Sequence, residues 1–216
     1  FYWANIVHDI YYRYGFDEAA GNFQETNFTG QGTGGDAMIV DTLDPDGGIP
    51  VFGPNILVSA DGTSPRITLG PYTTPDPDTM SSLSNEIFVH EYGHGVSIRL
   101  VGGPSNISVL TNSQGGGLGE GWGDWQALML HQKVTDTPLS QEVSGDYYLQ
   151  DPAGVRNYPY TTDMTVNALT YESYNSPFPD GNAGNESHNA GEIWASVLWD
   201  LNWQMISRCE FDADLY

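Results

Sequence analysis

The feature that most constrains this chain is the segment from Ile87 to Gly95, which reads IFVHEYGHG. Its apolar residues predict a buried helix, on which His90 and His94 lie one turn apart on the same face. Two imidazole nitrogens can then bind one metal ion, and Glu91 lies beside that ion, where a general base for a metal-bound water belongs. A helix with two incidental histidines is the alternative that this motif alone leaves open.

A third metal ligand is expected further along the chain. A hydrolytic zinc site takes three protein ligands and keeps one position open. The glycine-rich residues 115–119 lead into Glu120 and Asp124, which share a face if they lie on a helix. We expect Glu120 to be the third ligand and Asp124 to accept the outer N–H of a ligating histidine. The alternative for Glu120 is a carboxylate that stabilises the N-terminus of a helix.

Several motifs together resemble the fungalysin metallopeptidases, which are relatives of thermolysin. They are HEYGHG at 90–95, RLVGGP at 99–104, GEGWGD at 119–124 and the opening segment FYWANIVHDIYY at 1–12. Gly93 and Val101 depart from the threonine that the family usually has at these positions, and neither position carries a ligand. The resemblance covers nearly the whole chain, and the family's catalytic domain extends further at both ends.

The expected fold is α+β, and the resemblance implies a thermolysin-like protein of two lobes with the zinc ion in the cleft between them. Residues 1–103 would form a partly β N-terminal lobe with the metal-binding helix, and residues 104–216 a mainly helical lobe with the third ligand and the oxyanion histidine. The two lobes would form one catalytic unit, incomplete at both ends. The hydrophobic pattern predicts a helix over 1–14, strands over 37–40, 55–59 and 66–69, and the metal-binding helix over about 79–101. Residues 104–118 are expected to form a polar connection.

Two further catalytic positions follow from the resemblance. His188 comes just before a helix expected over about 189–208, and its implied role is to stabilise the oxyanion from the wall opposite the metal. The alternative is that His188 merely lies next to the residue that caps this helix and has no catalytic role. Arg156 lies in a pattern similar to the family's, so it can bind the substrate carbonyl beyond the scissile bond. A structural salt bridge is an equally good interpretation of Arg156.

Two substrate-binding positions are weaker predictions. The resemblance suggests that the strand beginning at Asn55 holds a peptide by backbone pairing, although a purely structural hairpin explains it nearly as well. A tyrosine such as Tyr171 or Tyr174 can help to polarise a carbonyl, but core packing is the ordinary role of such residues.

The charge of the chain limits its partners. Six lysines and arginines face 28 aspartates and glutamates, which gives a formal charge of −22. Phosphate backbones and anionic membrane surfaces would be repelled, so neither nucleic acid nor a membrane is an expected partner. Protein or peptide substrates are expected instead, and the resemblance implies an inhibitory propeptide. The spare carboxylates allow a calcium ion, for which Asp41, Asp44 and Asp46 are candidates, with a solvated turn as the alternative.

Secretion is inferred mainly from the resemblance. Three N-x-S/T sequons at Asn27, Asn106 and Asn185 would accept glycans on a secretory route. The single cysteine, Cys209, cannot form a disulfide within the chain, and a buried thiol is the commoner state for such a residue.

The combined prediction is a secreted zinc endopeptidase. One zinc ion would be held by His90, His94 and Glu120, while Glu91 would move the proton from water to the leaving amine. The resemblance implies a preference for an apolar residue after the cleaved bond. Two alternatives remain: a zinc aminopeptidase, which needs an acidic anchor for the free amine of its substrate, and an inactive or truncated peptide-binding fragment.

Overall fold

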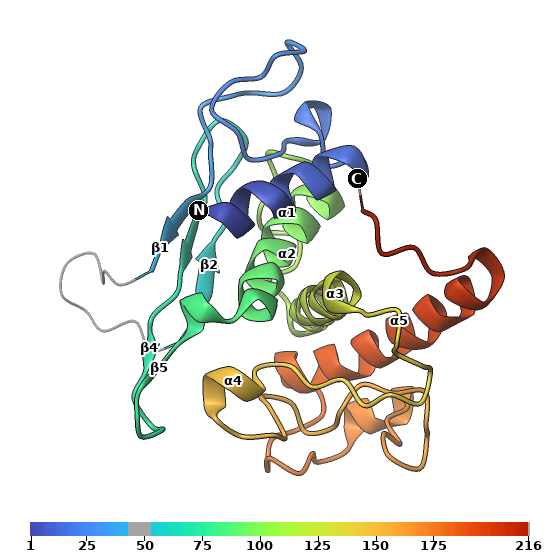
Figure 1. Cartoon of the computed structure of the whole chain (residues 1–216). Helices are drawn as coiled ribbons and strands as arrows, with labels where there is room; N and C mark the ends of the chain where they lie inside the picture. The colour runs from blue at the N-terminus through green and yellow to red at the C-terminus, as the bar shows by residue number, and fades with distance from the viewer. Residues whose placement is uncertain (43–52, 216) are drawn as a thin grey trace. The chain divides into compact units, whose positions relative to one another are not determined.

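The computed structural model describes residues 1–42 and 53–215. This part of the chain divides into two compact units, Phe1–Val109 and Leu110–Leu215. Helices and strands both occur, which confirms the α+β prediction (Figure 1). The expectation that the two parts form one catalytic unit stays a prediction. Of the candidate calcium segment, Asp44 and Asp46 lie outside the described residues, and Asp41 forms an ion pair with Arg66.

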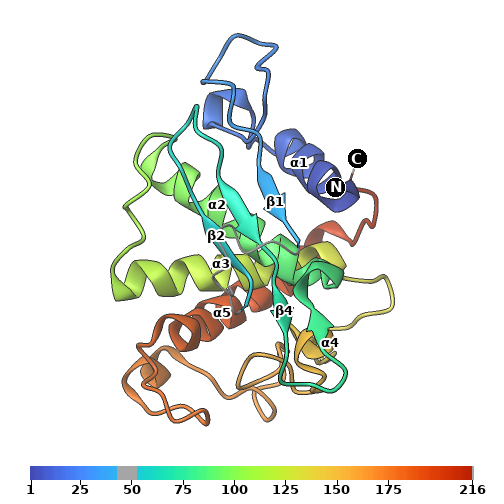
Figure 2. The same cartoon turned by 90° about the vertical axis from the view of Figure 1, so that its left-hand side faces the viewer.

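The first unit combines helices with short strands. Its elements in chain order are α1 (Tyr2–Arg13), η1 (Glu18–Ala20), β1 (Ile39–Asp41), β2 (Asn55–Leu57), β3 (Arg66–Thr68), β4 (Pro71–Tyr72), β5 (Thr79–Met80), η2 (Ser81–Leu83) and α2 (Asn85–Gly102). The predicted hairpin is present, because β2 runs antiparallel to β3 with Asn55 opposite Thr68. Since β1 pairs with the other edge of β3, the sheet order is β1-β3-β2 and β2 is an edge strand. The helix α2 packs against β2 (Figure 2).

The helix α2 begins later than the sequence pattern predicts. Residues 79–83 form β5 and η2, and the helix starts at Asn85 rather than near Thr79. Ser84 is the N-cap residue, whose hydroxyl accepts a hydrogen bond from the backbone N–H of Ile87, so it satisfies one of the free donors of the first turn. The helix ends at Gly102, and Gly103 has a φ of 78°, in agreement with the predicted stop.

Arg99 anchors the C-terminal half of α2. Its guanidinium is fully buried, and it donates to the backbone oxygens of Gly21 at 2.9 Å and Ser59 at 2.8 Å. It also forms an ion pair with Asp36 at 3.1 Å. A buried cation is tolerated only when it is paired and hydrogen-bonded. Arg99 of the RLVGGP motif therefore has a structural role, since its contacts connect α2 to two loops.

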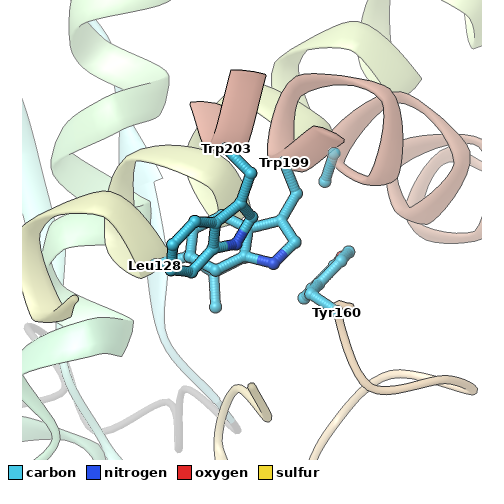
Figure 3. Close-up of a cluster of buried hydrophobic side chains, with 5 residues drawn as sticks. Leu128, Tyr160, Trp199 and Trp203 are labelled. Carbon is cyan, nitrogen blue, oxygen red and sulfur yellow. The ribbon is translucent and has the colours of Figure 1, made fainter. Parts of the chain in front are cut away.

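The second unit is mainly helical. Its elements in chain order are α3 (Ser113–His131), α4 (Asp146–Leu149), η3 (Tyr171–Asn175) and α5 (Ser187–Cys209). The two long helices, α3 and α5, lie side by side (Figure 1). Figure 3 shows their core, in which Trp199 and Trp203 of α5 meet Leu128 of α3 and Tyr160 from the intervening loop.

The glycine-rich residues 115–119 belong to α3, so the predicted loop over 104–118 is wrong at its C-terminal end. Asn112 caps the helix by accepting the backbone N–H of Gly115 at 2.7 Å. Glycine is a poor helix former, but these positions need it because α5 approaches closely. A Cβ on Gly117 would lie 2.6 Å from the Cβ of Ala190, and one on Gly121 would lie 2.7 Å from the carbonyl oxygen of Gly191. Tertiary packing has therefore overridden the local preference.

Surface positions in the second unit include one correction. Cys209 is exposed, so the expectation of a buried thiol is wrong. Asn185 of the second unit and Asn106 of the first are exposed, as a glycan acceptor must be. Within the described residues, no helix is long and apolar enough to cross a bilayer.

Candidate metal centre and catalytic groups

The two histidines of α2 have the arrangement that their spacing predicts. The rings of His90 and His94 lie with centroids 4.6 Å apart and planes at 90°, so both project from one face. His90 is 7% exposed and Glu91 is 6% exposed, so both side chains are largely shielded from bulk water. A metal ion bound by this pair would have the carboxylate of Glu91, the residue after His90, beside it on the same helix.

The edge strand β2 lies next to this end of α2. A Cβ on Gly95, which directly follows His94, would lie 3.3 Å from the Cδ1 atom of Ile56. Asn55 is exposed in this strand. An edge strand is the kind of element with which a peptide can pair, and the assignment of Asn55 to substrate binding stays a prediction.

In the second unit, α3 carries the two predicted carboxylates, and Arg156 bonds to both. The Nε atom of Arg156 donates to Oδ2 of Asp124 at 2.7 Å, and Nη2 donates to Oδ1 at 2.8 Å. The same Nη2 lies 3.4 Å from Oε2 of Glu120. Burial by itself would lower the pKa of Arg156, but the Asp124 carboxylate outweighs it and the pKa lies well above the usual range. Arg156 thus forms a structural salt bridge, one of its two predicted roles, and its role in substrate binding stays a prediction.

Asp124 has another partner in the same unit. Tyr160 donates its hydroxyl hydrogen to Oδ2 of Asp124. Burial and this carboxylate together raise the pKa of Tyr160 well above its usual range, so the phenol stays protonated as a donor. Asp124 therefore holds Arg156 and Tyr160 in place, and its predicted contact with a ligating histidine stays a prediction.

His188 lies within the first turn of α5 rather than before the helix. Its Nδ1 atom lies 2.9 Å from Oε1 of Glu186, and its Nε2 atom lies 3.7 Å from Oε1 of Glu120. Glu186 also accepts the backbone N–H of His188 and of Asn189, so it caps the helix and orients the ring at once. When Glu186 accepts from Nδ1, the Nε2 atom lies on the side of Glu120, and it is a hydrogen-bond donor only when the ring carries both protons.

Glu192 was not predicted from the sequence, although it joins the first turns of α5 to the Arg156 loop. Its Oε1 atom accepts the backbone N–H and the side-chain amide of Asn157, both at 2.8 Å. It is 1% exposed, and within the described residues its Oε2 atom has no hydrogen-bond partner. The only signal in the sequence was an acidic residue in the apolar run that follows Asn189.

Comparison with known proteins agrees with these features. The model of the fungalysin metallopeptidases matches residues 1–216. The chain belongs to the fungalysin metallopeptidase family.

The relatives of this fungalysin chain bear names that state an activity. It is 39% identical over 208 residues to extracellular metalloproteinase 1 of Arthroderma otae, extracellular metalloproteinase 5 of Arthroderma gypseum and extracellular metalloproteinase 1 of Trichophyton rubrum. Each match covers 96% of this chain and 31% of the relative. The chain thus spans about a third of the length of these curated relatives.

One weaker candidate of the fungalysin chain lies on the surface. Tyr171 is 79% exposed in η3 and stacks on Tyr174, with ring centroids 6.3 Å apart. The expectation that Tyr171 packs in the core is therefore wrong, and its role toward a substrate carbonyl stays a prediction.

Burial of Glu192 makes the stability of this fungalysin chain depend on pH. Burial is the largest effect and raises the pKa of Glu192 from 4.5 to about 7, against the opposing hydrogen bonds of Asn157. Because the folded state holds this proton more tightly, the group's contribution to stability is present below about pH 4.5 and is lost as the pH rises to about 7. Glu192→Gln keeps an acceptor for Asn157 and cannot ionise. We expect the variant to gain about 3 kcal/mol of unfolding free energy relative to wild type between pH 4.5 and pH 8.

Urea unfolding of both proteins across this pH range measures the difference. A gap that stays constant with pH would show that Glu192 has the same pKa in the folded and unfolded states.

Proposed function

We propose that this chain is the catalytic part of a secreted zinc endopeptidase. The observation that carries the proposal is the pair His90 and His94 on one face of α2, with Glu91 beside it, in a chain matched along its whole length by a metallopeptidase family. The named activity of the relatives supports the same conclusion.

The metal would be held by His90, His94 and Glu120, which offer two imidazole nitrogens and one carboxylate oxygen. This donor set, with one position left open, is the one that hydrolytic zinc sites use. A bound zinc ion lowers the pKa of water toward about 7 and polarises the substrate carbonyl.

The chain's own residues would supply the remaining steps. Glu91 accepts the proton of the attacking water and then passes it to the leaving amine. His188 donates a hydrogen bond to the carbonyl oxygen while that oxygen gains negative charge. Among the described residues, Nε and Nη2 of Arg156 bond to Asp124 and Glu120, so we assign Nη1 as the donor to a substrate carbonyl. Asn55 would lie in the strand that pairs with the peptide backbone.

Proteins or peptides are the proposed substrates. Secretion is proposed because the relatives are named extracellular metalloproteinases. An inhibitory propeptide remains an expectation from the family, and the charge of −22 still argues against nucleic acid and anionic membranes as partners.

Metal analysis tests the proposal directly. Protein purified without chelator should contain one zinc ion per chain, and 1,10-phenanthroline should abolish casein hydrolysis until zinc is restored. Casein hydrolysis indifferent to phenanthroline, or a zinc-free active protein, would contradict the proposal.

Peptides of graded length with acetylated N-termini separate an endopeptidase from an aminopeptidase, because an aminopeptidase needs the free amine.

A further inference from the structure

The second unit contains a polar cavity of about 700 Å³. Its wall is formed by the loop around Arg156 and Asn157, the loop around Asp180, and the first turns of α5 from Glu186 to Glu192. This volume lies in the range that small-molecule sites occupy. Because two of the proposed active-site groups, Arg156 and His188, belong to the wall, a bound substrate would have access to it.

Carboxylates outnumber basic side chains in this wall. The wall contains three carboxylates, those of Asp180, Glu186 and Glu192, and two basic side chains. Both basic side chains are already paired. Arg156 is held by Asp124 and Glu120, and His188 is held by Glu186. His188 is therefore paired with Glu186 inside the wall, whereas among the described residues neither basic side chain forms an ion pair with Glu192.

Two of the three carboxylates are saturated with hydrogen bonds from the protein. Asp180 accepts from the backbone and side-chain amides of Asn182 and from Asn189. Both oxygens of Glu186 accept from the first turn of α5. Burial raises the pKa of Asp180 and of Glu186, but these hydrogen bonds together outweigh it and hold both pKa values below their usual range. Neither group needs a ligand.

Glu192 differs from both. Asn157 occupies its Oε1 atom, whereas the buried Oε2 atom has no partner within the described residues. A buried carboxylate oxygen without a donor is costly. Glu192 lines the cavity, so its Oε2 atom is the acceptor that a donor bound there would pair with.

We propose that this cavity is a substrate subsite for a positively charged group, an ammonium or guanidinium, which Glu192 binds through Oε2. The proposal rests on the peptidase function proposed above. An apolar side chain would leave Oε2 unpaired, whereas a cation supplies the missing donor and favours the ionised form of Glu192 against the burial that raises its pKa. The polar cavity does not suit the apolar residue expected directly after the cleaved bond, so it serves a different position of the substrate.

A bound calcium ion fits the cavity less well. Calcium takes six to eight oxygen ligands, and the oxygens of Asp180 and Glu186 are engaged by N–H and O–H donors. Within the described residues of the second unit, no three carboxylate or imidazole atoms come close enough together to share an ion.

The cationic group has two sources, a lysine or arginine side chain and a free N-terminal amine. Quenched fluorescent peptides distinguish them. One series varies each of the two positions on either side of the cleaved bond among lysine, arginine, norleucine and glutamine, and each peptide is made with a free and an acetylated N-terminus. A preference that survives acetylation assigns the cavity to a side chain, and one abolished by acetylation assigns it to the amine.

For the zinc-loaded wild type, we expect kcat/KM to be at least about tenfold higher with the cationic group than with its neutral counterpart. Glu192→Gln should reduce this preference to about twofold or less while casein is still hydrolysed, because its amide keeps the bond to Asn157 and loses the charge. Asp180→Asn is the matched control, since it removes a charge from the same wall at a saturated carboxylate, and it should keep the preference.

Several outcomes would overturn the subsite. They are a wild type with no preference for a cationic group, an unchanged preference in a folded Glu192→Gln variant, or an equal loss in Asp180→Asn. If Glu192→Gln does not fold, the wild-type peptide series and the Asp180→Asn variant still decide. Hydrolysis without any preference removes only the subsite, whereas no hydrolysis of casein or of any peptide removes the proposed function.

Discussion

Glu91→Gln should lower kcat by about 10²–10⁴-fold while the protein still binds one zinc ion per chain. Glutamine has the size and shape of glutamate, but its amide cannot accept a proton from water at neutral pH. The expected loss is the contribution of a well-placed general base. Zinc binding should persist, because in the proposed arrangement the ligands are His90, His94 and Glu120 and Glu91 is not among them.

Steady-state kinetics and elemental analysis on the same preparation measure the two quantities together. Glu25→Gln is a suitable control, because it makes the same chemical change at an exposed position of the same unit. Its kcat should match that of wild type. If Glu91→Gln loses zinc as well as activity, Glu91 acts as a ligand, and if its kcat stays within about tenfold of wild type, the base lies elsewhere.

The sequence predicted best what depends on spacing along one helix. The four-residue interval from His90 to His94 predicts from helix geometry alone that both rings share a face. The structure confirms this prediction. The β2–β3 hairpin was predictable for a similar reason, because two apolar runs flank the turn residues Asp61 and Gly62.

Predictions failed where tertiary contacts decide the local structure. The glycines around Gly117 resemble a loop by composition, but they are helical because Ala190 of α5 leaves no room for a side chain. The prediction started α2 too early, because a helical pattern of apolar residues does not reveal that residues 79–80 pair as β5 with β4. Propensity is a weak prior where packing supplies the larger energy.

Long-range polar contacts were also beyond the sequence. Arg156 could be interpreted as a substrate ligand or as a salt bridge, and only the structure shows both of its paired nitrogens on Asp124. Glu192 is 35 residues away from its partner Asn157, so no local pattern links them. Such networks need the fold before they can be recognised.

His188→Ala should lower kcat by about 10²–10³-fold with a much smaller change in KM. The carbonyl oxygen carries more negative charge in the tetrahedral state than in the bound substrate, so a donor aimed at it stabilises the transition state selectively. The structure supports such a role, because Glu186 holds Nδ1 at 2.9 Å and leaves Nε2 on the side of Glu120, 3.7 Å away. Zinc content should not change, since His188 is not among the proposed ligands.

The same substitution also separates catalysis from helix capping. Alanine at this position keeps the backbone N–H that Glu186 accepts at 2.9 Å, and Asn189 keeps its own bond to Glu186. The melting temperature should therefore change little while kcat falls. His131→Ala is the matched control, because His131 is an exposed histidine at the end of α3 whose Nδ1 contacts the carbonyl oxygen of Ala127. Its kcat should equal that of wild type. A His188→Ala variant that melts earlier and keeps its kcat would make His188 a structural residue of α5, and one that loses zinc would place His188 among the ligands.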